Sequence, residues 1–149
     1  MSEQVTAVTA WEALFRSQVS VMRYLGAEFP IDDISFNEYD VLFTLSRQPE
    51  RRLRIRDLNR DILLTQPSVS RMVDRLAARG LVNKLQDVDD ARGIVVELTD
   101  KGFELFRRAA VRHIRSINER VGTALSQDEM RTLVALCDKL RLAGSDPEC

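Results

Sequence analysis

The stretch LLTQPSVSRMVDRLAARGLV, residues 63–82, places an apolar stripe and a polar, cationic face on one predicted helix. At 100° per residue, its apolar positions fall within about 100° of one another on a helical wheel. These positions are Val69, Met72, Val73 and Leu76. Facing away from them are Ser70, Arg71, Asp74 and Arg75, with Ser68 at the edge. We expect the helix over residues 66–79, with Thr65 as its N-cap, Pro67 in its first turn and Gly80 as its stop.

The outward face of this predicted helix has the side-chain chemistry of a DNA-reading surface. Short serine side chains let a helix backbone approach a groove closely, and arginine donates two hydrogen bonds to guanine O6 and N7. The amides at a helix N-terminus attract phosphate. A shorter helix before it, with residues 63–65 as the turn, matches a helix-turn-helix layout. The alternative is a face that is only solvated, so the face by itself leaves both interpretations open.

Basic charge is concentrated in the middle of a chain whose total charge is close to zero. The 149 residues include 22 Lys and Arg against 23 Asp and Glu, a formal net charge of −1. From Arg51 to Arg79 there are eight Arg and three Asp, so this segment carries +5 and the other residues −6. Such a distribution is typical of a protein with one face that meets phosphates.

The composition argues against several classes of protein. Hydrophobic residues make up 44% of the chain, enough for a packed core, and no apolar run approaches the ~18 residues of a membrane span. The first residues show no secretory signal, so we expect a cytoplasmic protein. Two cysteines, Cys137 and Cys149, and one histidine, His113, are too few for a disulfide framework or for most metal sites. No cofactor-binding or catalytic motif is present, so we expect neither an enzyme nor a cofactor.

Caps and breakers predict the helices around the central stretch. Three capping boxes mark helix N-termini: Thr9 with Glu12, Ser35 with Glu38, and Ser126 with Glu129. The first of these helices should end at Gly26, and the second should stop before Pro49. A short helix over residues 55–62 follows, and its start is unusual because Arg54 occupies the place of a capping residue.

A β-hairpin and a long helix complete the predicted order of elements. The runs 81–86 and 94–99, separated by the polar segment DVDDARG, are typical of two paired strands. After Thr99, apolar residues recur at helical spacing as far as Val121. The last helix carries Cys137 on its apolar stripe, where we expect it to be buried and inert.

Three short motifs occur between Phe36 and Gly102. They are RLxxxGLV at residues 75–82, an Asp-x-Arg wing tip at Asp90 and Arg92, and LTxxG at residues 98–102. Together they resemble the MarR family of bacterial winged helix-turn-helix regulators. The resemblance implies a sequence-specific, DNA-binding transcriptional regulator, a repressor that binds a palindromic operator and is released by a small aromatic or phenolic ligand.

The family fold is mainly α with a small β-wing, in a single domain over residues 1–149. The resemblance implies a winged helix-turn-helix lobe at residues 36–102, flanked by dimerisation helices at 5–30 and 103–143. The long apolar seam of the fifth helix favours the implied homodimer, because some 20 residues, about 30 Å, exceed what a winged-helix core covers. The alternative is an intramolecular helical hairpin with an ordinary surface.

The family's recognition helix reads the major groove. Carried onto this chain, the candidate base or phosphate contacts are Gln66, Ser68, Ser70 and Arg71. Arg75 is a candidate phosphate contact, or else a partner for Asp74 or for a wing carboxylate. A winged helix that binds a protein and no DNA is the alternative function.

The family's wing reaches the minor groove through the Arg at its tip, here Arg92. Its other interpretation is a loop Arg paired with Asp89 or Asp90. The segment DVDDARG has one Arg against three Asp, so either the wing binds DNA modestly or its carboxylates orient Arg92. Arg54 is a second departure from the family pattern, which has a small capping residue there.

Aromatic side chains are candidates for the effector pocket that the resemblance implies. The candidate residues are Trp11, Phe15, Tyr39, Phe43 and His113. Aromatic residues at helical spacing are more often part of a core. His113 stands next to Arg112 and near Arg115, so we expect it to be exposed or at an interface.

Overall fold

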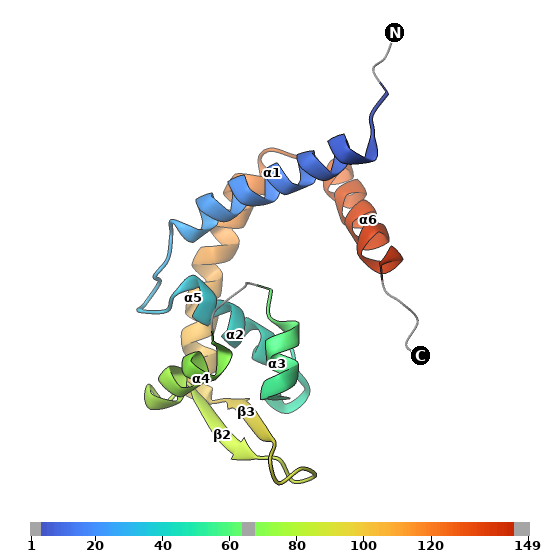
Figure 1. Ribbon diagram of the computed structural model, residues 1–149. Helices are drawn as coiled ribbons and strands as arrows, with labels where there is room; N and C mark the ends of the chain where they lie inside the picture. The colour runs from blue at the N-terminus through green and yellow to red at the C-terminus, as the bar shows by residue number, and fades with distance from the viewer. Residues whose placement is uncertain (1–3, 64–67, 145–149) are drawn as a thin grey trace. The chain divides into compact units, whose positions relative to one another are not determined.

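The computed structural model describes residues 4–63 and 68–144, and these form a mainly helical fold with a small three-stranded sheet (Figure 1). The α-helices are α1 (Ala7–Gly26), α2 (Phe36–Ser46), α3 (Ile55–Asp61), α4 (Val69–Ala78), α5 (Asp100–Ile117) and α6 (Gln127–Ala143). The strands are β1 (Arg52–Arg54), β2 (Val82–Gln86) and β3 (Ile94–Leu98). A 3-10 turn (Pro49–Arg51) precedes β1, and a π-helical turn (Asn118–Gly122) follows α5. The expected fold class is confirmed.

The chain divides into two compact units. Residues 25–113 form one, called here the central lobe, and it contains α2 to α4, the sheet and most of α5. Residues 1–24 and 114–149 form the other, called the helical unit, which contains most of α1 and all of α6. All the residues that the sequence predicts to bind DNA belong to the central lobe.

Two of the three predicted capping boxes are present. Ser35 Oγ accepts the amide of Glu38 at 3.1 Å, and Glu38 Oε1 accepts the amide of Ser35 at 3.0 Å. The box at the start of α6 has the same arrangement. The predicted start of the first helix at Thr9 is wrong, because α1 begins at Ala7 and Thr6 Oγ1 accepts the Thr9 amide at 3.2 Å. An equivalent hydroxyl three residues earlier therefore takes the capping role.

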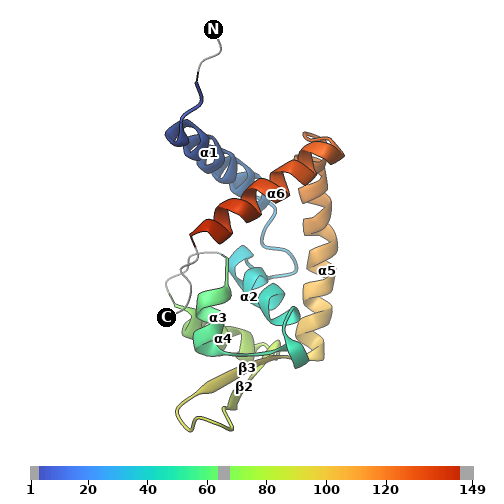
Figure 2. The ribbon, with the colours of Figure 1, turned by 90° about the vertical axis from the view of Figure 1, so that its right-hand side faces the viewer.

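The sheet has the strand order β1-β3-β2, and both pairs are antiparallel. The predicted hairpin is confirmed, with Val82 opposite Leu98 and Gln86 opposite Ile94. In both ribbon views its tip projects beyond the helices of the lobe (Figures 1 and 2). Strand β1 was not predicted, since three residues are too few to show the alternation of a strand, and only its pairing with β3 identifies it.

The core of the central lobe lies between α2, α3, α4 and the sheet. Its fully buried members include Leu42, Leu45, Leu58, Val73, Leu76 and Val96. The apolar stripe predicted for the central stretch is confirmed, because all four of its residues are buried. Burial of these side chains fixes the rotation of α4 about its axis, and so decides which residues face outward.

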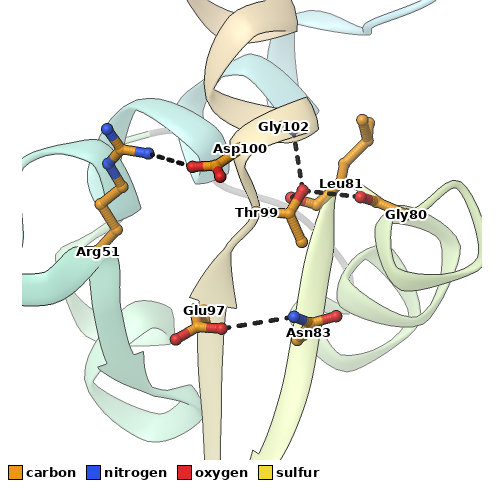
Figure 3. A network of polar contacts seen from close by, with 8 residues as sticks. All are labelled: Arg51, Gly80, Leu81, Asn83, Glu97, Thr99, Asp100 and Gly102. Carbon is orange, nitrogen blue, oxygen red and sulfur yellow. Dashed lines mark hydrogen bonds and ion pairs between the residues drawn. The ribbon is translucent and has the colours of Figure 1, made fainter.

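The LTxxG motif joins the sheet to α5 (Figure 3). The Thr99 hydroxyl lies 2.7 Å from the Gly80 carbonyl oxygen and accepts the Gly102 amide at 2.9 Å. A Cβ on Gly102 would lie 2.1 Å from the Leu81 carbonyl oxygen and 2.8 Å from Leu98 Cδ1. The glycine is therefore required by close approach of backbone, and the motif packs the start of α5 against the chain that follows α4.

Candidate nucleic-acid interface

Helix α4 presents a polar, cationic face to solvent. Ser70, Arg71, Asp74 and Arg75 are exposed, opposite the buried stripe. Within residues 4–63 and 68–144, no carboxylate forms an ion pair with Arg71 or Arg75. Asp74 pairs instead with Lys84 of β2, with 2.6 Å between Oδ1 and Nζ. Both arginines are therefore available to an anionic partner.

The start of α4 differs from the expectation. The helix begins at Val69, and Ser68 is its N-cap, with Oγ accepting the Arg71 amide at 3.2 Å. The N-cap is therefore Ser68 where Thr65 was predicted, and both Thr65 and Pro67 lie outside the described residues. Serine is the stronger N-cap and its hydroxyl meets a free amide of the first turn. The predicted contact Gln66 lies outside the described residues.

A buried carboxylate on α2 holds the chain just after α3. Asp40 is 5% exposed, and its Oδ2 accepts the Leu63 amide at 2.8 Å. This role was not predicted from the sequence, because an Asp inside a predicted helix is usually solvated. Only the apolar neighbours Tyr39 and Val41 indicated from the sequence that Asp40 is buried.

The other end of α4 is tied to the lobe through Arg79. Its Nη1 donates to the Asp33 carbonyl oxygen at 2.9 Å and lies 3.4 Å from Glu38 Oε2. The Arg79 carbonyl oxygen accepts Lys101 Nζ at 3.0 Å. Gly80 follows with a φ of 75°, the left-handed conformation that ends a helix, as predicted. Arg79 is therefore a structural cation, distinct from the unpaired ones on the outward face.

The wing tip leaves its Arg side chain without an acidic partner in the described chain. Arg92 is exposed, and only its backbone amide contacts a carboxylate, donating to Asp90 Oδ1 at 3.0 Å. The expected pairing of its guanidinium with Asp89 or Asp90 is not observed. Asp87, at the base of the tip, pairs with Arg54 Nε at 2.7 Å. Asp90 thus accepts a backbone hydrogen bond within the wing tip, whereas Asp87 forms an ion pair with Arg54.

Aromatic side chains of the central lobe gather around His113. The imidazole ring packs edge-on against Phe29, Phe36 and Tyr39, with ring centroids 5.4, 5.5 and 4.9 Å away. His113 is 8% exposed, so the expectation of an exposed or interface histidine is wrong. Its neighbours 112 and 115 do face outward, as the helical period requires.

Burial controls the protonation of this cluster. Desolvation lowers the pKa of His113, and the nearby Glu28 carboxylate opposes that shift. His113 Nδ1 and Glu28 Oε2 are buried with no hydrogen-bond partner among the described residues. Burial also raises the pKa of Tyr39 to about 12. The cluster therefore combines an apolar wall with two polar atoms that lack a partner in the described chain.

The five candidate effector residues lie in two groups. Tyr39 and His113 belong to the cluster of the central lobe, and Phe43 stacks on Tyr39 with centroids 6.5 Å apart. Trp11 and Phe15 contact each other on α1, with centroids 5.7 Å apart, and both are exposed. Their assignment to a ligand pocket stays a prediction.

The described residues show no sign of several other kinds of site. Between residues 4 and 144, apart from 64–67, no three acidic, His or Cys side chains are grouped as metal ligands. In that same part of the chain, every helix is too short or too polar to cross a bilayer. Cys137 is half-buried rather than buried, because α6 exposes most of its surface.

Comparison with known proteins relates the chain to one family. Residues 32–93 match the sequence model of the MarR family. The HTH-type transcriptional regulator YhbI of Bacillus subtilis (strain 168) is 29% identical over 122 residues, 77% of this chain and 76% of the relative.

Two solved structures share the fold over nearly the whole chain. Sco3205, a MarR family transcriptional regulator from Streptomyces coelicolor in complex with DNA, is 25% identical with a TM-score of 0.80, covering 99% of this chain and 94% of the other. PcaV, a transcriptional regulator from the same organism in complex with its natural ligand, is 26% identical with a TM-score of 0.73, covering 97% and 100%.

Proposed function

We propose that the chain is a DNA-binding transcriptional regulator of the MarR family and a homodimeric repressor of a palindromic operator, as the family match over residues 32–93 and the fold shared with Sco3205 support. Each protomer inserts α4 into a major groove and places its wing on the adjacent minor groove. Occupation of a promoter by such a dimer excludes polymerase from the same DNA. The protein acts in the cytoplasm, where that DNA lies.

The outward face of α4 is the observation that carries this proposal. Arg71 and Arg75 stand one helical turn apart, both exposed and both unpaired within the described chain. Arg71 and Ser70 read base edges, since they lie in the first turn of the helix, and Arg75 contacts a phosphate. Ser68 keeps its hydroxyl proton for a phosphate oxygen while its oxygen caps the helix. Gln66 is proposed from the sequence alone.

Exposed apolar side chains on the helical unit support the dimer. On α1 they are Val8, Trp11 and Phe15, and on α6 they are Leu133, Val134, Leu136, Leu140 and Leu142. Large apolar side chains exposed in this number on two helices favour a protein–protein interface. A two-fold dimer places two α4 helices on half-sites about 10 bp apart, which is why the operator should be a palindrome.

A small aromatic or phenolic effector is the proposed signal for release. The relative PcaV binds a natural ligand, and the aromatic cluster around His113 offers flat apolar walls for a ring. Tyr39, Phe43 and His113 are the proposed contacts in the central lobe, and Trp11 and Phe15 those on α1.

Selection of duplexes from a random pool, followed by fluorescence anisotropy on the selected duplex, tests the function. We expect affinity to fall steeply with salt, because each phosphate contact releases counterions. We also expect the selected sequences to be palindromic, and the protein to sediment as a dimer. A flat salt dependence with no sequence enrichment would instead identify a winged helix that binds proteins.

A further inference from the structure

Arg54 connects the start of α3 to the wing. It occupies the N-cap position of α3, but its side chain makes no capping hydrogen bond. The guanidinium instead extends to the hairpin, where Nε lies 2.7 Å from Asp87 Oδ2 and Nη2 lies 3.9 Å from Asp89 Oδ2. The side chain of Asp87 is only 6% exposed. The Arg at the N-cap of α3 and an Asp of the acidic wing therefore form one ion pair.

Asp87 is also the residue around which the wing tip closes. Its amide donates to the Gly93 carbonyl oxygen at 3.0 Å, and its Oδ1 accepts the Asp89 amide at 3.0 Å. The Gly93 amide donates to the Asp90 carbonyl oxygen at 2.9 Å. A Cβ on Gly93 would lie 3.0 Å from Asp87 Cβ, so the two strands approach closely here. The tip is therefore a compact loop whose base is held from outside by Arg54.

The contact lies beside the side chain that the proposed function assigns to the minor groove. Arg54, Arg56, Asp87, Asp90 and Arg92 all line one cavity of about 210 Å³ between α3 and the wing. Arg54 is held by its ion pair, whereas Arg56 and Arg92 have no acidic partner in the described parts of the chain. The Arg54–Asp87 ion pair thus ties the wing tip to the start of α3, whereas the β1–β3 pairing and the Asp74–Lys84 ion pair hold the strands of the hairpin.

We propose that Arg54 is a positioning residue for the wing: through Asp87 it holds the tip where Arg92 meets the minor groove while α4 occupies the major groove. This inference rests on the proposed DNA-binding function. A wing that occupied the binding position for only a tenth of the time would bind about tenfold more weakly, since apparent affinity scales with the competent fraction. The ion pair keeps that fraction high before DNA arrives.

Two substitutions remove the contact from its two sides. We expect Arg54→Gln and Asp87→Asn each to lower affinity for the selected duplex about fivefold to tenfold. The Asp87 variant gives the sharper result, because loss of a negative charge beside DNA would by itself strengthen binding. Arg54→Lys keeps the charge and should retain most of the affinity. Arg56→Gln is the matched control, since it removes an Arg from the same cavity without touching the ion pair.

Two measurements separate positioning from direct contact and from general loss of structure. In an Arg92→Ala background, neither substitution should weaken binding further, because the wing has lost the side chain being positioned. In the free protein, hydrogen exchange at the amides of Asp89, Arg92 and Gly93 should accelerate about tenfold in Arg54→Gln and stay unchanged in Arg56→Gln. Thermal unfolding of each variant identifies any that has lost the fold. If Arg54→Gln has lost it, the DNA affinity and the hydrogen exchange of Arg54→Lys are compared with those of the wild type instead.

Several results would overturn the proposal. Unchanged or tighter binding by Asp87→Asn would do so, as would unchanged exchange at the wing amides in Arg54→Gln. A full loss from Arg54→Gln in the Arg92→Ala background would make Arg54 a direct phosphate contact instead. Failure of the wild-type protein to bind any duplex would remove the proposed function, and the exchange measurement on free protein would still decide whether Arg54 holds the wing.

Discussion

Asp40 and Leu63 are joined by a hydrogen bond of 2.8 Å between a buried carboxylate and a backbone amide, 23 residues apart in the chain. The bond ties α2 to the segment between α3 and α4. Because the Leu63 amide belongs to no helix or strand, the carboxylate satisfies a donor that secondary structure leaves free. A carboxylate on α2 therefore holds the backbone that follows α3.

Asp40→Ala should lower the free energy of unfolding by about 1–3 kcal/mol, since it removes a charged acceptor from the hydrogen bond to the Leu63 amide. Urea denaturation gives this value, and anisotropy on the selected duplex should show weaker binding as well. Asp74→Ala is the control, because its exposed pair with Lys84 contributes about 0–1 kcal/mol. Equal stability of the two variants would contradict the assigned role of Asp40.

Gly102→Ala should destabilise the protein by about 1–3 kcal/mol, the range for overpacking. The new Cβ would meet the Leu81 carbonyl oxygen at 2.1 Å, so backbone has to move. Helix propensity alone predicts the opposite sign, because Ala in a helix is about 1 kcal/mol better than Gly. Gly144→Ala, where a Cβ meets nothing within 4 Å, should leave the melting temperature nearly unchanged.

Arg71→Ala and Arg75→Ala should weaken DNA binding in different ways. Arg71→Ala should relax the preference at one base pair by about 1–3 kcal/mol, as expected for a base contact. Arg75→Ala should weaken binding to all sequences alike and reduce the salt slope by about 1. Repeating the duplex selection with each variant measures both effects. Unchanged selectivity of the Arg71 variant would remove that residue from base readout.

Arg92→Ala should weaken binding to all duplexes and reduce the dependence of affinity on salt, because its guanidinium is exposed and free of acidic partners in the described chain. Anisotropy at several salt concentrations, on selected and on random duplexes, measures both effects. Arg79→Gln is an informative comparison, since that Arg is bonded within the lobe and should affect stability more than the salt slope. A loss confined to one sequence would contradict the minor-groove role of Arg92.

Acidification should destabilise the central lobe through His113. Burial lowers its pKa in the folded state, so the unfolded chain binds the proton more tightly. The resulting stability is present above the ordinary pKa of histidine and is lost as the pH falls through the lowered folded value. His113→Phe should flatten this dependence between about pH 7 and about pH 5. Urea denaturation at several pH values measures the slope, and equal slopes in both proteins would refute the prediction.

Local patterns in the sequence were sufficient to predict most of the elements. The capping boxes at Ser35 and Ser126 depend on atoms three residues apart, and the stripe of α4 depends on one helical period. Both kinds of interaction are complete within one element, so the order of residues determines them. The start of α4 was misplaced because Thr65 and Ser68 are both capping residues and only the packing of the helix decides between them.

Apart from the caps at Thr6 and Ser68, the interactions missed from the sequence join distant segments. Strand β1 exists only through its pairing with β3, and Arg54 meets Asp87 only after the hairpin folds back toward α3. The burial of Asp40 and His113 likewise depends on neighbours from other elements. The candidate DNA-binding face was predictable because it is the side of one helix, whereas the contacts that hold that face in place were not.

The connection between β3 and α5 has a mechanical consequence. Leu98 ends the strand and Asp100 begins the helix, so a single residue, Thr99, separates them. The Thr99 side chain is held in place by hydrogen bonds to Gly80, Leu81 and Gly102. The start of α5 is therefore held close to the end of β3, the strand that pairs with both β1 and β2. A change in the direction of the first turn of α5 should therefore reach the β2–β3 hairpin that carries Arg92, without any flexible linker to absorb it.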